Sequence, residues 1–238
     1  MKLKTFIINL DSRADRWEHI QKEAEKADLK HVERFPGVVP IVNHLLTTPC
    51  IDISKFYKFK SLGDVNSVKY CIGAAGCKLS HLNLLKRIKQ KLHCFDYFLI
   101  LEDDCVFDIE NSTEFYNSVE NSLQSIKENN IDFNILYLSC RFLDKDDFTT
   151  ISPSLLKCNS NHGYTTHSYI INPKNIDKII SHIENSVVEI DNTYTTLDER
   201  YVAYPMLTYQ LKNKSDILSH IHADEDNDYD YGEFHKHF

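Results

Sequence analysis

Residues 98–104 read Phe-Leu-Ile-Leu-Glu-Asp-Asp, an apolar run that ends in three consecutive acids. The apolar part is typical of a buried β-strand, and the acids follow at its carboxyl end. Three carboxylates at the exit of a buried strand repel one another and lose hydration unless a cation or substrate hydroxyls lie beside them. The stretch therefore predicts a ligand site at the edge of a sheet, with a hard divalent metal ion as the expected cation.

The segments around this stretch alternate between strand-like and helix-like patterns. Strands are predicted where β-branched and aromatic residues gather, in residues 5–10, 133–138 and 166–171. Amphipathic helices are predicted where apolar residues recur at helical spacing, after Ser12, after Gly73 and Gly76, from Phe115 to Ile126, and after Pro173. Strands separated by helices imply an α/β fold with a mostly parallel sheet that helices cover on both sides.

The position of the acids agrees with their chemistry. In such a sheet, ligands collect outside the carboxyl ends of the strands, where Glu102, Asp103 and Asp104 fall. The competing interpretation is a solvated strand end or a helix N-cap, which would be preferred for an isolated acidic triplet. The preceding apolar run favours the ligand site.

The composition excludes several classes of protein. The chain has 238 residues, 42% of them hydrophobic, and a formal net charge of −8. It can therefore bury a full core, but it lacks the clustered basic surface that binding to nucleic acid requires. Its seven cysteines show no paired zinc spacing, and we expect most of them to be reduced core residues.

No segment of the sequence is typical of a membrane span. The apolar run at residues 5–10 is too short for a signal peptide, and no stretch of about 18 apolar residues occurs. We therefore expect a cytoplasmic protein without a signal peptide or a transmembrane segment. The abundance of Lys, Asn, Ile and Tyr suits an AT-rich genome and indicates a bacterial cell or a virus-infected host cell.

The chain is predicted to form one domain followed by a tail. Residues 35–68 follow no regular period and contain several prolines and glycines, which predicts a long irregular excursion of the kind that often shapes a site. No repeat or low-complexity linker divides residues 1–222, which we assign to a single domain. Residues 223–238 are rich in Asp and Glu, and we predict a loosely ordered acidic C-terminal tail there.

Several short motifs occur along the chain in the order in which a known family has them. They are Ile8-Asn9-Leu10 with Arg13, Asp15 and Arg16; Gly76-Cys77 with Leu79-Ser80-His81; Leu99 to Asp104; Tyr169-Ile170-Ile171; Leu197-Asp198-Glu199; and Ser215-Asp216-Ile217. Through them the chain resembles glycosyltransferase family 25, which includes bacterial lipooligosaccharide galactosyltransferases and procollagen galactosyltransferases. One position departs from the family pattern, because Ala74 stands where the family often has an acidic residue.

The resemblance implies a fold of GT-A type with a Rossmann-like sheet, and an inverting, metal-dependent transfer of a hexose. The implied donor is a UDP-sugar, with galactose as the default, and the implied acceptor is a hydroxyl of a glycan or of a hydroxylated peptide. Mn²⁺ or Mg²⁺ would neutralise charge on the phosphate oxygens of the leaving nucleotide diphosphate. Glu102 and Asp104 are expected to share the metal and the ribose hydroxyls. Asp103 is expected to lie at the donor site with a different neighbour.

The first family motif assigns further donor-binding residues. Asn9 and Leu10 belong to the motif itself. Arg13 and Arg16 follow at the start of a predicted helix, where an arginine fork and free backbone amides suit a diphosphate or a uracil edge. The competing interpretation is that one or both arginines form surface salt bridges.

Four other polar residues are assigned with the help of the resemblance. Ser80 and His81 are expected to shape the donor pocket, although a core histidine bonded to a backbone carbonyl is a strong alternative. His220 and His222 follow the last strand-like segment, and either is a candidate to complete the metal shell. The alternative for this pair is two surface histidines in a fraying terminus.

An inverting transfer also needs a base that takes the proton of the acceptor hydroxyl. The candidates are Asp198 and Glu199, with Asp198 first because the matching family segment also carries an Asp. Asp216 is a third candidate. Alternatively, Thr196 and Asp198 start a short helix as N-caps.

Two functions of other classes are compatible with a strand that ends in acids. A metal-dependent nucleotidyltransferase or phosphohydrolase would consume nucleoside triphosphates rather than a UDP-sugar. An inactive nucleotide-sugar-binding module, which Ala74 favours, would bind the donor without turnover. All three functions predict a bound metal ion, but only the first predicts sugar transfer.

Overall fold

The computed structural model describes residues 1–141, 145–159 and 165–211. Its helices are α1 (Ala14–Lys26), α2 (Val42–Leu45), α3 (Val65–Lys89), α4 (Ser112–Glu128), α5 (Ile176–Asn185) and α6 (Ile190–Thr195). Its strands are β1 (Leu3–Asn9), β2 (Val32–Pro36), β3 (Tyr97–Glu102), β4 (Cys105–Phe107), β5 (Ile135–Tyr137), β6 (Phe148–Ser152), β7 (Leu155–Cys158), β8 (Ser168–Ile171), β9 (Arg200–Ala203) and β10 (Thr208–Gln210). No helix within these ranges has both the length and the apolar character that crossing a bilayer requires.

The strands form a large mixed sheet and a small one. The large sheet has eight strands in the order β2-β1-β3-β8-β5-β9-β7-β6, and β10 pairs with β4 in the small one. β1 is parallel to β2 and β3, and β5 is parallel to β9, whereas the other neighbours in the large sheet are antiparallel. The α/β class is confirmed, but the sheet is mixed rather than mostly parallel. The reason is that β5 is followed by the β6–β7 hairpin instead of a crossover helix, and β8 then returns antiparallel between β3 and β5.

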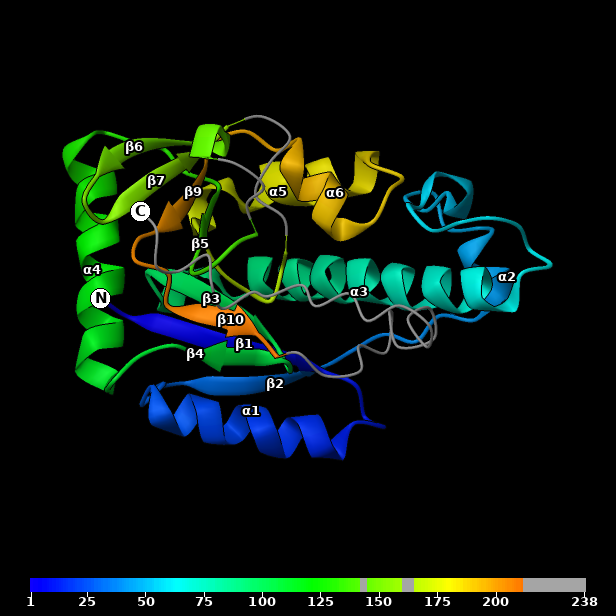
Figure 1. Ribbon diagram of the computed structural model, residues 1–238, viewed down its shortest axis with the longest axis horizontal. Coiled ribbons are helices and arrows are strands. Elements are labelled where there is room, and N and C mark those ends of the chain that lie inside the picture. Colours follow the sequence, from blue (N-terminus) through cyan, green and yellow to red (C-terminus); the bar gives the residue numbers. More distant parts are fainter. Residues whose placement is uncertain (142–144, 160–164, 212–238) are drawn as a thin grey trace.

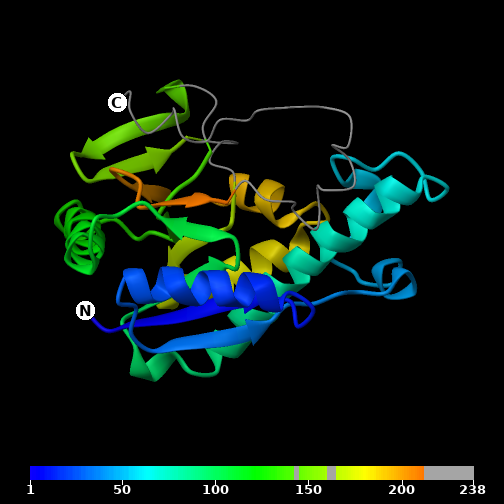
Figure 2. The same cartoon turned by 60° about the horizontal axis from the view of Figure 1, so that its bottom comes forward.

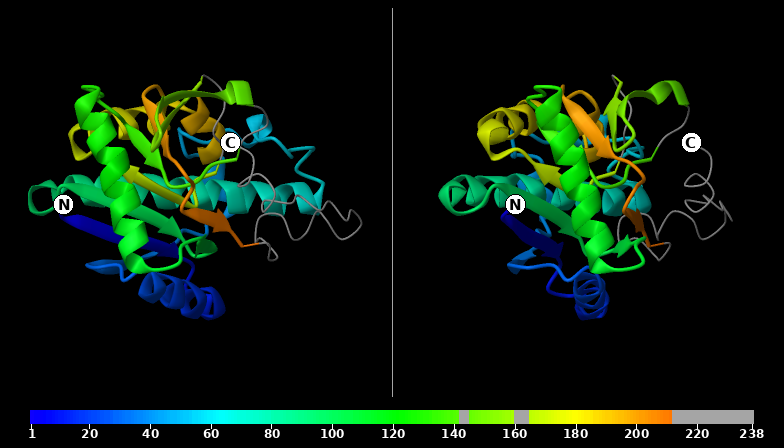
Figure 3. Two further views of the ribbon diagram at one scale, coloured as in Figure 1. Left: turned by 60° about the vertical axis from the view of Figure 1, so that its left-hand side comes forward. Right: turned by 90° about the vertical axis from the view of Figure 1, so that its left-hand side faces the viewer.

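Helices cover both faces of the large sheet, as predicted. Alternate residues of a strand point to opposite faces, and β3 shows this clearly. Phe98 and Ile100 belong to the apolar core that α3, α5 and α6 share, whereas Leu99 and Leu101 belong to the core under α1 and α4. Figure 2 shows α1 lying along β1 and β2, and the right-hand view of Figure 3 has α4 nearest the viewer with α3 behind.

Helix α3 is longer than the sequence pattern predicted. It begins at Val65 because the Asp64 side chain accepts hydrogen bonds from the backbone N–H groups of Asn66 and Ser67, which is a typical N-cap. The helix has 25 residues and so spans about 37 Å. It extends beyond the sheet toward α2 (Figure 1). The preceding residues 37–64 are largely irregular, as expected, and carry α2 and one short 3₁₀ turn.

The strand topology gathers polar residues at one edge of the sheet. The carboxyl ends of β1, β2 and β3 meet there because these strands are parallel neighbours. Ile8 is level with Glu102, so Asn9 and Asp103 emerge next to each other. The antiparallel strand β8 starts at the same edge. One edge of the sheet therefore carries the acids of β3 together with the residues that precede β8.

Candidate active site

A cavity of about 340 Å³ lies at this edge, between the ends of β1 and β3, the start of α1 and the middle of α3. Its walls include most of the residues that the sequence singled out, namely Asn9, Leu10, Arg16, Ser80, His81, Glu102, Asp103 and Asp104. Other lining residues had not been assigned to the site individually, among them Val38, Val39, Lys69, Ile72, Cys77 and Gln210. The fold thus brings segments from five separate parts of the chain to one cavity.

Glu102 faces α3 and the start of β8. Its Oε1 accepts a 2.6 Å hydrogen bond from the Thr166 hydroxyl and lies 3.2 Å from Nε2 of His81. Burial acts to raise the pKa of Glu102, but the hydrogen bond and charge of His81 outweigh it and hold the pKa below its ordinary value. Glu102 therefore contributes a negative charge to the cavity.

Asp103 turns the other way, toward α1. Its Oδ1 lies 3.0 Å from the Arg16 guanidinium, and its Oδ2 accepts a 2.8 Å hydrogen bond from the Asn9 amide. Asp103 and Glu102 therefore contact different neighbours. Burial raises the pKa of Asp103 in spite of Asn9 and Arg16. Asn9 also accepts a 2.8 Å hydrogen bond from Arg34, which fixes its amide orientation.

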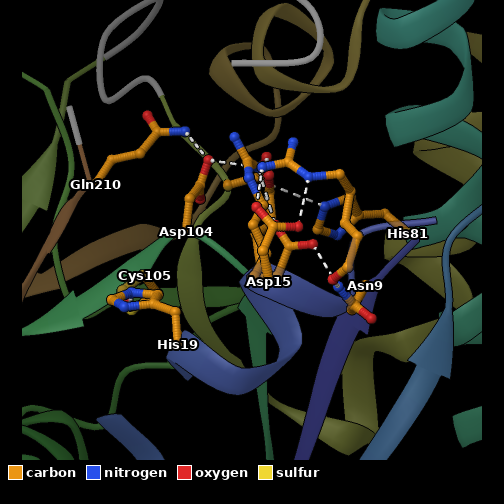
Figure 4. Close-up of polar contacts among 12 residues, drawn as sticks. Asn9, Asp15, His19, His81, Asp104, Cys105 and Gln210 are labelled. Atoms are coloured by element: carbon orange, nitrogen blue, oxygen red, sulfur yellow. Dashed lines mark hydrogen bonds and ion pairs between the residues drawn. The ribbon is translucent and has the colours of Figure 1, made fainter. Parts of the chain in front are cut away.

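Asp104 is the least well compensated of the three acids. Its Oδ2 accepts a 3.0 Å hydrogen bond from the Gln210 amide and lies 3.5 Å from Arg16 (Figure 4). Its Oδ1 is buried and has no hydrogen-bond partner among the described residues. Burial, followed by the charge of Glu102, raises the pKa of Asp104 to about 7. An orphaned carboxylate oxygen beside a second carboxylate is the donor set that a hard divalent cation prefers, so Glu102 and Asp104 fit such an ion.

The cavity has few positive charges to balance these acids. Arg16 contacts both Asp103 and Asp104. Lys69, which the sequence analysis did not single out, also lines the cavity and is exposed. Within residues 1–141, 145–159 and 165–211, the Lys69 ammonium forms no ion pair or hydrogen bond. An anionic ligand in the cavity would find this cation available.

His81 is fully buried, but its partners differ from the backbone carbonyl that the alternative interpretation supplied. Its Nδ1 lies 2.7 Å from the Tyr169 hydroxyl, which in turn lies 3.2 Å from the Tyr194 hydroxyl. Its Nε2 faces Glu102. The imidazole is thus held between a chain of tyrosine hydroxyls and an acid of the cavity.

Ser80 shapes the cavity wall through the backbone. Its hydroxyl donates a 2.6 Å hydrogen bond to the Gly76 carbonyl and accepts a 2.8 Å bond from the Val38 N–H group. A Cβ atom at Gly76 would lie 2.4 Å from the Val38 carbonyl oxygen, so only glycine permits this approach. Gly76 and Ser80 together hold the chain after β2 against α3.

Asp191 also lies near Glu102, although no pattern in the sequence predicted it. It lies in the first turn of α6, where an acid is common in any helix. Its Oδ1 accepts a 3.2 Å hydrogen bond from the Thr166 hydroxyl, which also bonds Glu102. Burial, followed by the charge of Glu102, raises the pKa of Asp191 to about 6. Only the packing of α6 beside β8 and α3 reveals this carboxylate as part of the cluster.

Arg13 does not line the cavity. Its guanidinium pairs with Asp15 at 2.8 Å, close to the surface interpretation that the sequence left open. The Arg13 carbonyl accepts a 3.0 Å hydrogen bond from the Asn9 amide, which ties the start of α1 to the end of β1. The structure therefore gives Arg13 a local contact and leaves Arg16 as the arginine at the cavity.

Asp198 and Glu199 lie far from the cavity, and this placement argues against either as the base. They precede β9, which is parallel to β5 and starts beside Ile135 at the opposite edge of the sheet. Asp198 pairs with Lys178 at 2.8 Å, and Glu199 pairs with Lys157 at 2.8 Å. The physical reason is strand direction, because residues before β9 and residues after β3 lie at opposite ends of strands that run the same way.

The remaining predicted residues fall outside the described part of the chain. His220 and His222, the expected late metal ligands, belong to residues 212–238, as do Asp216 and the acidic tail at 223–238. Their roles, and the domain boundary at residue 222, stay predictions.

Comparison with known proteins agrees with the resemblance seen in the motifs. Residues 2–194 match the family described as glycosyltransferase family 25 (LPS biosynthesis protein). Among solved structures, a glycosyltransferase involved in the glycosylation of the major capsid of PBCV-1 aligns with 93% of this chain and 98% of its own, at a TM-score of 0.38 and 8% identity. No curated protein matches the chain. Because the family match covers most of the sequence, the chain belongs to glycosyltransferase family 25 and is a glycosyltransferase.

Proposed function

We propose that this glycosyltransferase moves a hexose from a UDP-sugar to a hydroxyl of a glycan or of a hydroxylated peptide, with inversion and with Mn²⁺ or Mg²⁺ bound. Galactose is the default sugar from the family resemblance. The observation that supports the proposal most is the buried Asp104 carboxylate, whose Oδ1 has no partner among the described residues and which lies beside Glu102 in a cavity. A buried unpaired carboxylate is costly in a protein that binds no cation there.

We assign a different role in donor binding to each charged residue of the cavity. Glu102 and Asp104 would hold the divalent ion, which when bound stabilises the charge on the leaving diphosphate. Arg16 keeps Asp103 and Asp104 in place through its two ion pairs. We assign Lys69 to the phosphate oxygens of the donor, because its ammonium lines the cavity and makes no ion pair with a described residue. Without these cations, the carboxylates of the cavity would repel a diphosphate.

We place the base at Asp191 rather than at Asp198. Among the described residues, the Asp191 carboxylate contacts the Thr166 hydroxyl and pairs with no lysine or arginine. Thr166 also bonds Glu102, so the base would lie close to the donor site. A raised pKa of about 6 makes Asp191 a better proton acceptor near neutral pH than an ordinary Asp.

A donor panel tests the proposal. The full chain is incubated with UDP-galactose, UDP-glucose, UDP-N-acetylglucosamine and nucleoside triphosphates, each with Mn²⁺ and with a chelator, and released nucleotide is quantified. Mn²⁺-dependent release of UDP from one UDP-sugar, lost in Asp104→Ala, is the expected result.

Each competing function has a distinct outcome in the same panel. Consumption of nucleoside triphosphates with no UDP-sugar turnover would identify a nucleotidyltransferase or phosphohydrolase. Binding of a UDP-sugar by calorimetry without UDP release, with and without glycan acceptors, would identify a binding module. Unchanged UDP release in Asp104→Ala would remove the metal assignment.

A further inference from the structure

Three side chains of different chemistry meet in the wall of the cavity. Cys77 and His81 lie one turn apart on the same face of α3, and Glu102 ends β3. The Cys77 sulfur, an imidazole nitrogen of His81 and a carboxylate oxygen of Glu102 all lie within 4.8 Å of one another. All three residues line the cavity, so an ion could reach them from solvent.

The second nitrogen of His81 is already held in the way that metal-bound histidines require. Nδ1 lies 2.7 Å from the Tyr169 hydroxyl, so in the tautomer that protonates Nδ1 the Nε2 lone pair is directed at Glu102 and Cys77. Histidines that bind metals usually donate their other N–H to a fixed partner, which sets the ring orientation. The Tyr169–Tyr194 contact at 3.2 Å fixes that partner in turn.

The surrounding charge also favours a cation at this position. Glu102 and Asp191 are bridged by the Thr166 hydroxyl at 2.6 and 3.2 Å. Burial, followed by the charges of Glu102 and Asp191, raises the pKa of the Cys77 thiol well above its ordinary value. A divalent ion reverses this effect, because it binds the thiolate and neutralises both carboxylates.

The ligand types decide which ion this would be. Mn²⁺ and Mg²⁺ prefer oxygen ligands, whereas a thiolate with an imidazole and one carboxylate suits Zn²⁺ in a tetrahedral site. We propose that Cys77, His81 and Glu102 form a Zn²⁺ site distinct from the hard-cation position at Asp104. Glu102 would be shared between the two positions. Zn²⁺ therefore competes with the donor-bound cation and inhibits transfer, a consequence that rests on the proposed function, whereas Zn²⁺ binding itself does not.

Cobalt reports on the site independently of activity. Co²⁺ replaces Zn²⁺ in such sites and gives a thiolate-to-cobalt charge-transfer absorption in the near ultraviolet. Metal-free full-length protein is titrated with CoCl₂, and ZnCl₂ is then added. For the native protein we expect a saturating band that disappears when Zn²⁺ is added. Cys77→Ser should show no band. His81→Gln and Glu102→Gln should show the band, but their affinity for Co²⁺ should be lower by at least about tenfold.

Two other cysteine variants serve as matched controls. Cys94 is exposed, and the neighbouring Cys140 and Cys158 thiols are a second place where cobalt could bind sulfur. Cys94→Ser and Cys140→Ser should both keep the band. A band that is absent from the native protein, that survives in Cys77→Ser, or that disappears in Cys140→Ser would overturn the proposal.

Protection from alkylation covers the case in which Cys77→Ser does not fold. Native protein is treated with iodoacetamide in alkaline buffer, long enough for Cys77 to react without Zn²⁺ in spite of its raised pKa. The reaction is repeated with Zn²⁺, and modification of each cysteine is measured by mass spectrometry. Zn²⁺ should protect Cys77 and leave Cys94 reactive, whereas equal modification of Cys77 in both samples contradicts the site.

The Zn²⁺ site and the proposed function can fail separately. A Zn²⁺ site without UDP-sugar turnover would refute the proposed function alone, and turnover without the cobalt band would refute this inference alone.

Discussion

Two pairs of adjacent acids border strands of the same sheet, and they differ in burial and in the direction of their pKa shifts. Asp103 and Asp104 follow β3, whereas Asp198 and Glu199 precede β9 at the opposite edge. In sequence both are adjacent acids beside an apolar strand. In the structure Asp103 and Asp104 are only 7% and 6% exposed, and burial raises the pKa of both.

The second pair is compensated in place. The Asp198 side chain is 63% exposed and is bonded by Lys178, which lowers its pKa. The Glu199 side chain is 35% exposed; burial acts to raise its pKa, but bonds from Lys157 and Tyr201 lower it overall. Each of these acids thus has its own lysine, while Asp103 and Asp104 share Arg16. A binding site is therefore recognised by buried carboxylates that have too few neighbouring cations to balance their charge, rather than by acidic residues alone.

The largest expected difference is in activity. Asp104→Asn removes the charge that we assign to the metal ion while keeping the hydrogen-bonding shape, and we expect it to lower kcat/KM by roughly 10³-fold, about 4 kcal/mol. Asp198→Asn should change kcat/KM by less than about threefold, because its carboxylate contributes only a surface ion pair. UDP release with saturating Mn²⁺ measures both. Equal losses of kcat/KM in the two variants would show that the edge with Asp104 and the edge with Asp198 do not differ in function.

Lysines of the two edges should differ next. Lys69→Gln removes the cation that we assign to the donor phosphates, and we expect KM for the UDP-sugar to rise roughly tenfold, about 1.4 kcal/mol, with a smaller change in kcat. Lys69→Arg should retain most of the affinity. Lys178→Gln, at the other edge, is the matched control and should leave KM unchanged. An unaltered KM in Lys69→Gln would refute the assignment.

The pH dependence of stability should also separate the edges. The pKa of Asp104 in the folded protein, about 7, lies above that of an unfolded Asp, so the folded state binds this proton more tightly. In the metal-free protein, the contribution of Asp104 to the free energy of unfolding is therefore fully present below about pH 4. It is lost as the pH rises through about 7. Asp191 acts in the same direction through about pH 6. Asp198 and Glu199, with lowered pKa values, act in the opposite direction and only in acid.

We therefore expect the Tm of metal-free protein to fall between about pH 5 and about pH 8, and to fall less in Asp104→Asn. The variant should be more stable than the native chain at about pH 8 by roughly 1 to 4 kcal/mol, which is several degrees in Tm. Thermal unfolding in chelator-containing buffers measures this. The groups that face Asp104 are Glu102, Asp103, Arg16 and Gln210, so the Asp198→Asn curve should overlay that of the native chain in this range. A native Tm that rises with pH would contradict the raised pKa.

The smallest effect belongs to the lysine-paired edge. The Lys178 and Asp198 side chains are 51% and 63% exposed, so water and salt screen their attraction. Lys178→Gln should cost less than about 1 kcal/mol, a shift of no more than about 4 °C in Tm. A larger loss would show that this edge carries more of the fold's stability than its exposure suggests.

Much of the fold follows from local patterns. The apolar run at 98–101, the strand patterns at 5–10 and 166–171, and the apolar stripes of the helices identified the elements, because burial on one face leaves a periodic trace in the sequence. Strand direction left no such trace. The antiparallel course of β8 depends on its pairing with β3, which is a contact between residues that lie far apart in the chain.

The sequence by itself determined that acids end an internal strand and that the chain belongs with family 25 glycosyltransferases. Only the tertiary structure decided which acids are compensated. Lys178 neutralises Asp198 because the fold brings α5 to the residues that precede β9. Asp191 lies near Glu102 because the Thr166 hydroxyl contacts both carboxylates. Charge compensation acts through space over a few ångströms, between residues that the chain separates widely, so no local pattern could have encoded it.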